Sequence, residues 1–96
     1  MAIIATKSIS AEDQWSDVFY LAGDGAGWAR RALICATSSD STVTLRRYAS
    51  DGTTVLASID LDSAMSTIET PVPGMYDVGV ATGNYGGTAL TITVEQ

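Results

Sequence analysis

The sequence predicts an all-β protein: an antiparallel sandwich of two sheets, or a small jelly roll, with about seven or eight short strands. Thr, Ser, Gly and Val are abundant and Lys, Arg and Glu are scarce, which favours strands and turns over helices. Turn signals recur about every ten residues. Several runs alternate apolar and polar residues, and such half-buried strands need a second layer over their apolar face. The 96 residues form a single domain, 1–96.

The first third of the chain contains three candidate strands. Residues 2–10 are rich in β-branched side chains, and residues 15–21 hold Trp, Val, Phe, Tyr and Leu, with Trp15 expected in the core. A flexible, glycine-rich loop at 22–27 follows. Residues 28–37 have the Ala, Leu and Arg content of a helix, but strands surround them. Periodicity does not settle so short a run, and its neighbours favour a strand.

The clearest feature is a hairpin in the middle of the chain. Val43, Leu45 and Arg47 alternate with polar residues in the run 42–49, and a second alternating run covers 54–61. Asp51-Gly52 separates the two runs, and this pair favours a tight hairpin with positive φ. The pattern predicts two antiparallel strands with one solvent-exposed face.

The last third continues the pattern. Residues 62–70 form a looser connection with room for a short strand, and 71–74 form a turn with Pro73-Gly74 suited to the centre of type II. A strand at 76–81, a tight connection at 82–87 and a final strand at 90–95 follow. We expect mostly sequence-adjacent hairpins. The last strand is expected to pair with the first, or to form an edge that another subunit covers.

Composition excludes several function classes. The net charge is −6, which disfavours nucleic acid and anionic membranes and suits a basic partner surface. The chain has no histidine, and its single cysteine, Cys35, is expected to be a buried small hydrophobe. No apolar run approaches the length of a membrane span, and no signal peptide is recognisable. We expect a protein that is cytosolic when made.

Two patterns are weak candidates for chemistry. Gly23-Asp24-Gly25-Ala26-Gly27 resembles a phosphate loop only superficially, because the spacing and the following Lys are missing, so a mobile loop is favoured. Five acids could ligate calcium, but they fit no calcium-loop pattern and are better explained as a solvated face: Asp51, Asp60, Asp62, Glu69 and Asp77. The sequence therefore predicts no enzyme, no cofactor and no metal.

Partner binding is the better expectation for the remaining polar and aromatic residues. The doublets Arg30-Arg31 and Arg46-Arg47 each point their side chains to opposite faces, so they can pair with acids across the sheet or on a partner. Aromatic residues often anchor protein interfaces. The candidate partner-binding residues are Trp28, Arg30, Arg46, Tyr48 and Tyr85, with Trp28 and Tyr85 expected to be exposed.

The last third also carries a resemblance to a known group of proteins. Pro73-Gly74, a strand with Tyr76, the run Thr82-Gly83-Asn84-Tyr85 and a last strand ending at Gln96 resemble small proteins from the structural-gene regions of tailed bacteriophages. Earlier stretches resemble them as well: Gln14-Trp15-Ser16-Asp17 and Val43-Thr44-Leu45-Arg46-Arg47. Two positions depart from the pattern, since Asp77 replaces a basic residue and Gly86-Gly87 a more polar turn.

The resemblance implies a virion structural protein. The expected function is that of a capsid decoration (cement) protein that binds the outer head surface and stabilises it. Its partners would be the major capsid protein and copies of itself, as homo-oligomers that in such proteins are often trimers. A tail- or fibre-associated module that recognises a receptor or glycan is the alternative.

Overall fold

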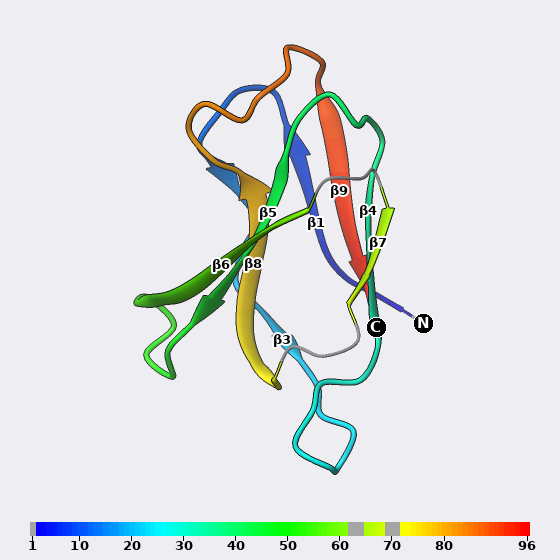
Figure 1. Cartoon of the computed structure of the whole chain (residues 1–96), viewed down its shortest axis with the longest axis vertical. Helices are drawn as coiled ribbons and strands as arrows, with labels where there is room; N and C mark the ends of the chain where they lie inside the picture. The colour runs from blue at the N-terminus through cyan, green and yellow to red at the C-terminus, as the bar shows by residue number, and fades with distance from the viewer. Residues whose placement is uncertain (1, 62–64, 69–71) are drawn as a thin grey trace.

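The computed structural model describes residues 2–61, 65–68 and 72–96, and the described chain is all β (Figure 1). Its strands are β1 (Ile3–Ile9), β2 (Gln14–Trp15), β3 (Phe19–Leu21), β4 (Ala32–Ala36), β5 (Val43–Tyr48), β6 (Val55–Leu61), β7 (Met65–Ile68), β8 (Gly74–Val80) and β9 (Leu90–Glu95). The predicted fold class is confirmed. The segment 28–37 is a strand only over β4, and residues 30–31 precede it without regular structure.

The strands form two antiparallel sheets. One sheet has the order β1-β9-β4-β7. The other has the order β2-β8-β5-β6, with β3 pairing a different stretch of β8. The expected pairing of the first and last strands is confirmed, because β1 lies along β9. Ala2 and Gln96 extend this pairing through two reciprocal backbone hydrogen bonds of 3.1 and 3.0 Å.

The expectation of sequence-adjacent hairpins is wrong for most of the described chain. Only β5 and β6 are neighbours both in sequence and in a sheet. Residues 81–89, expected to include a tight connection, instead cross from β8 in one sheet to β9 in the other. The expected strand at 15–21 is divided into β2 and β3, and Ser16 bridges the break because its amide donates to the carbonyl of Val78.

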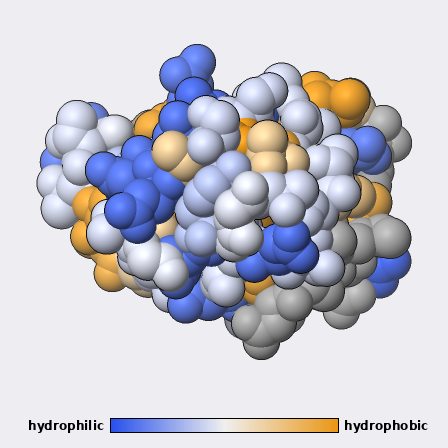
Figure 2. All heavy atoms as spheres, turned by 90° about the horizontal axis from the view of Figure 1, so that it is seen from above, coloured by the Kyte–Doolittle hydropathy of each residue, from blue (hydrophilic) through white to orange (hydrophobic). Residues whose placement is uncertain are grey.

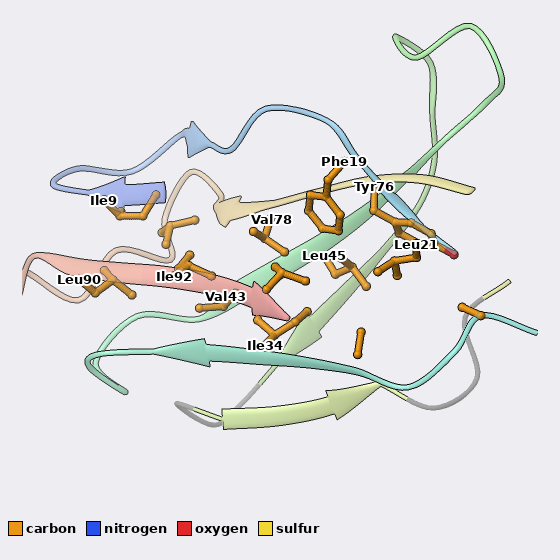
Figure 3. Close-up of a cluster of buried hydrophobic side chains, with 14 residues drawn as sticks. Ile9, Phe19, Leu21, Ile34, Val43, Leu45, Tyr76, Val78, Leu90 and Ile92 are labelled. Atoms are coloured by element: carbon orange, nitrogen blue, oxygen red, sulfur yellow. The ribbon is translucent and has the colours of Figure 1, made fainter. Parts of the chain in front are cut away.

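The core lies between the two sheets (Figure 3), and it is built from the inward-facing residues of the alternating strands. Its buried apolar residues are Ile9, Phe19, Leu21, Ala29, Ala32, Ile34, Val43, Leu45, Tyr76, Val78, Val80, Leu90, Ile92 and Val94. Trp15 is not among them, so its predicted core position is wrong. Cys35 is half-buried rather than fully buried.

The β5–β6 hairpin is confirmed, but its turn is longer than a two-residue turn. The amide of Gly52 donates to the carbonyl of Ala49, and Gly52 alone in the turn has positive φ, at 72°. Asp51 therefore occupies an ordinary turn position, and the glycine supplies the left-handed residue that follows it. The turn that precedes β8 also differs from the expectation, since Gly74 is already the first residue of that strand.

Candidate functional site

Two candidate sites lie on the sheet that contains β8, β5 and β6. The first is a cluster of side chains on the outer face of this sheet: Trp15, Arg46, Tyr48 and Asp77, here called the outer-face cluster. Strand alternation directs Val43 and Leu45 into the core, so Arg46 and Tyr48 point outward. The register pairs Arg46 with Asp77 on β8, which brings their side chains together.

The outer-face cluster is held by charge-assisted hydrogen bonds. The Arg46 guanidinium donates from Nε to Asp77 Oδ1 at 2.9 Å and from its terminal nitrogen to Asp77 Oδ2 at 2.6 Å. This two-point contact is the strong geometry for an arginine–carboxylate pair. The Tyr48 hydroxyl also donates to Asp77 Oδ2, at 2.6 Å. Asp77 is only 2% exposed, so its charge depends on these partners.

The Trp15 ring stacks on the guanidinium of the Arg46–Asp77 pair. The Arg46 guanidinium carbon lies 3.4 Å from the centroid of the Trp15 ring, in cation–π contact. The ring reaches this position because Gly79, its partner on β8, has no side chain. A Cβ at Gly79 would lie 2.7 Å from Trp15 Cε3 and 2.2 Å from the Gln14 carbonyl oxygen. The Trp15 indole N–H donates to Asp13 Oδ1 at 3.1 Å.

The electrostatics of the cluster favour its present protonation states. The hydrogen bond to Asp77 raises the pKa of the Arg46 guanidinium. Burial, and then the hydrogen bond to Asp77, raise the pKa of the Tyr48 phenol. The neutral phenol therefore contributes stability below its ordinary pKa, and this contribution is lost as the pH rises through the folded-state pKa. Since the polar atoms bind one another, the cluster fastens β2, β8 and β5 together.

The second candidate site is the free edge of the same sheet, formed by β6. In the described part of the chain β6 pairs only with β5, and the hairpin projects from the body of the molecule (Figure 1). Val55, Leu56 and Ile59 are 41%, 56% and 50% exposed. The alternation predicted that one face of this strand would be buried, but only Leu61 is half-buried. Apolar atoms reach the surface at the left margin of Figure 2, the side toward which the hairpin projects in Figure 1.

A groove lies beside this edge on the inner face of the sheet. Its volume is about 220 Å³, and its lining consists of Leu45, Arg47, Ala57, Ile59, Val72 and Tyr76. Among the described residues that line it, only the Arg47 side chain and the Tyr76 hydroxyl are polar. That hydroxyl donates to the carbonyl of Val72. The Nε atom of Arg47 is buried, and it has no hydrogen-bond partner among the described residues.

The five predicted partner-binding residues occupy three separate places. Arg46 and Tyr48 lie together in the outer-face cluster, and the predicted cross-sheet pairing of an arginine with an acid is confirmed by Arg46 and Asp77. Trp28, 51% exposed, and the exposed Arg30 lie at the end of the 22–29 loop, where the Asp24 carboxylate accepts from the Trp28 amide. Tyr85 lies in the β8–β9 connection and packs against the core, so its predicted exposure is wrong.

Several relevant residues were not identified as site residues. Asp77 appeared only as a weak calcium candidate, and Trp15 as a core residue. Arg47 was expected only as part of a doublet that can pair with acids, and the residues of β6 as members of an ordinary two-faced hairpin. A signal for Asp77 was present, because the opposed charges of β5 and β8 fall on outward positions of two alternating strands.

Metal and membrane features are absent from the part of the chain that the structure describes. No three His, Cys, Asp or Glu side chains there come together as a metal site. Asp62 and Glu69, two of the calcium candidates, lie outside the described residues. Nor do the described residues include a helix long and apolar enough to span a membrane.

Comparison with protein-family models, with curated proteins and with solved structures gives no match to this chain.

Proposed function

We propose that this protein is a non-enzymatic structural protein that docks on a larger protein assembly through its β6 edge. The observation that carries the proposal is the exposure of this strand, which places Val55, Leu56 and Ile59 at the surface beside an edge that no other described strand pairs. Natural proteins usually protect such edges with Lys, Pro or covering segments. The sequence of β6 contains no Lys, Arg or Pro. An unprotected edge of this kind is suited to an incoming strand.

We further propose that the assembly is the outer surface of a bacteriophage head. The resemblance of residues 73–88 to small phage structural proteins supports this identification, and the two-sheet fold agrees with it. The net charge of −6 suits a basic lattice surface. On a symmetric shell many modest contacts, including those between copies of this protein, reinforce one another. Such a protein stabilises the shell without any chemistry of its own.

The experiment is to measure the copy number of this protein relative to the major capsid protein, by quantitative mass spectrometry of particles purified from the phage that encodes it. A ratio near one, or near a simple fraction of one, is expected for a protein that decorates the lattice. Absence of the protein from purified particles would contradict the proposal.

A recognition module on the tail or fibres is the second candidate, because the 22–29 loop holds Trp28 at the surface beside Arg30. Asp24 Oδ1 orders this loop by accepting from the Ala26 amide at 2.7 Å. An exposed tryptophan on an ordered loop is suited to stacking on a sugar ring. A handful of copies per particle, with glycan binding that Trp28→Ala abolishes, would favour this candidate over decoration.

A further inference from the structure

We propose that the segment bound at β6 is an extended strand of a different chain, which places one Asp or Glu carboxylate on Arg47 and apolar side chains on either side of it. The inference rests on the proposed function, and it specifies the chemistry of the partner's segment. Three observations support it: the free edge, the unpartnered arginine and the faces on which the β6 side chains lie.

Among the described residues, Arg47 is the only charged side chain that lines the groove, and its buried Nε has no hydrogen-bond partner there. A buried donor without a partner is costly, so its presence calls for a ligand that accepts hydrogen bonds. The Tyr76 hydroxyl already donates to the carbonyl of Val72, so Arg47 is left as the donor for such a ligand. A carboxylate is the acceptor that best matches the planar fork of a guanidinium.

The register of the hairpin leaves a path for the carboxylate. Arg47 and Ala57 are direct partners across the β5–β6 pair, so only the small side chain of Ala57 separates Arg47 from the free edge. An added strand would lie about 4.8 Å beyond β6, and therefore about 10 Å from the β5 backbone. This distance is within the combined reach of an arginine and a glutamate side chain. The partner's acid therefore belongs opposite Ala57, on the inner face.

Apolar side chains of the partner should flank that acid. Ile59, half exposed, lies on the same inner face two residues along β6 from Ala57, and Leu45 and Val72 complete the apolar lining. Side chains two positions away on the added strand would point to this same face. The predicted motif is thus apolar-x-acid-x-apolar, which places a single negative charge within an otherwise uncharged contact.

A second copy of this chain does not satisfy Arg47. Two β6 strands paired antiparallel about a two-fold axis keep their inner faces on the same side of the sheet. The β6 residues paired with inner-face residues of β5 are Ala57, Ile59 and Leu61, none of which is acidic. The one acid of β6, Asp60, lies on the outer face, where it accepts a hydrogen bond of 2.9 Å from the Thr44 hydroxyl. Charge complementarity therefore favours a different chain.

The test uses the full-length protein and a pair of synthetic nine-residue peptides that alternate Thr and Val. In one peptide the central Val is replaced by Glu, and in the other by Gln. Binding is followed by the amide chemical shifts of the isotope-labelled protein. We expect shifts along β6 with both peptides and about tenfold tighter binding of the Glu peptide, because the Glu side chain adds a charge-assisted pair.

Three variants locate the effect. Arg47→Met retains the apolar stem and should remove the preference for Glu over Gln. Arg30→Met is the matched control, because Arg30 is exposed and is not among the groove-lining residues, and it should leave the preference intact. Ile59→Lys places a charge on the edge at a half-exposed position and should weaken both peptides at least tenfold without unfolding the protein. Equal affinities of the two peptides for the unaltered protein would overturn the proposal.

Three further outcomes separate this inference from the proposed function. Concentration-dependent shifts at β6 in the absence of peptide would assign the edge to a second copy and overturn the inference, whatever the copy number in particles. A copy number that is a simple fraction of the capsid protein's, together with equal affinities of the two peptides, would support the decoration function and contradict the acid-bearing partner strand. Absence from particles together with a clear preference for Glu would reject decoration and retain the chemistry of the edge.

Discussion

Asp77 is a carboxylate buried on the outer face of a sheet, and its environment explains how a charge is tolerated there. Arg46 supplies two donors and Tyr48 a third, while the Trp15 ring shields the guanidinium from water. The pairing follows from register rather than from sequence proximity, since the residues lie on strands separated by β6 and β7. Each member is satisfied only while β5 and β8 stay in register, so the pair specifies that register.

Asp77→Asn is expected to destabilise the protein by about 2–4 kcal/mol, because it leaves the Arg46 charge without a counter-ion in a partly buried position. Urea unfolding followed by circular dichroism measures the loss. Asp60→Asn is the control: Asp60 is exposed and accepts one bond from Thr44, so its loss should be below about 1 kcal/mol. Equal losses in the two variants would show that the buried pair has no special role.

At the scale of one element, the β5–β6 turn shows how a single side chain fixes a hairpin. The Asp51 carboxylate accepts from the amides of Thr53 and Thr54, each at 2.9 Å, and from the Thr54 hydroxyl at 2.6 Å. These bonds, the Thr54 hydroxyl first, lower the pKa of Asp51 to about 2. The ionised carboxylate thus contributes stability above its ordinary pKa, and the contribution is lost as the pH falls through about 2.

Carboxyl NMR titration should therefore place the pKa of Asp51 at about 2. Thr54→Val removes the hydroxyl donor and should raise this pKa toward the ordinary value of 3.8. Thr53→Val is the matched control, because the Thr53 side chain is the smallest cause of the shift while its amide is retained. A titration at the ordinary value in the unaltered protein would mean that the turn does not hold this carboxylate.

The attachment of β2 to β8 depends on a single glycine. Any side chain at Gly79 would collide with Trp15 and with the Gln14 carbonyl. Gly79→Ala should therefore cost about 1–3 kcal/mol and shift the Trp15 indole N–H resonance, because the ring must leave Arg46. Gly83→Ala meets no atom within 4 Å and is strained only by its φ of 85°, so it should leave that resonance unchanged. An unshifted indole signal in Gly79→Ala would contradict this packing.

For the molecule as a whole, the pairing of β1 with β9 closes the chain on itself. Ala2 and Gln96 exchange backbone hydrogen bonds, and the Gln96 side chain also donates to the carbonyls of Ala22 and Arg30. The two ends of the described chain are thus direct neighbours in one sheet. Strands at opposite ends of the sequence are thus paired, and a contact this non-local is expected to slow folding.

A circular permutant that joins Gln96 to Ala2 by an Asn-Gly turn and opens between Gly25 and Ala26 should fold to the same two sheets. It should also refold faster than the parent in stopped-flow measurements, because β1–β9 becomes a local hairpin. A permutant opened between Asp77 and Val78, inside the central strand β8, should fail to fold. Slower refolding of the first permutant would contradict a rate-limiting β1–β9 closure.

The sequence by itself determined the features that depend on neighbouring residues. Alternation placed Leu45 inside and Arg46 outside, and the Asp51-Gly52 pair identified the β5–β6 hairpin. Both were predictable because the side-chain period and the backbone φ are set within a few residues. At β4 the run's own periodicity did not settle the choice, and the strands predicted on either side favoured a strand over a helix. The alternation also indicated two layers, since alternating strands cannot remain half exposed.

Only the tertiary structure decided which strands meet and which surfaces remain open. β8 pairs with β2, β3 and β5, whereas β9 pairs with β1 and β4, and periodicity contains no information about such long-range partners. The sequence of β6 has the alternating pattern of a half-buried strand, yet all but its last residue are exposed. This exposure follows from the way the β5–β6 hairpin projects from the body of the molecule (Figure 1), which is a property of the packed molecule and not of any segment.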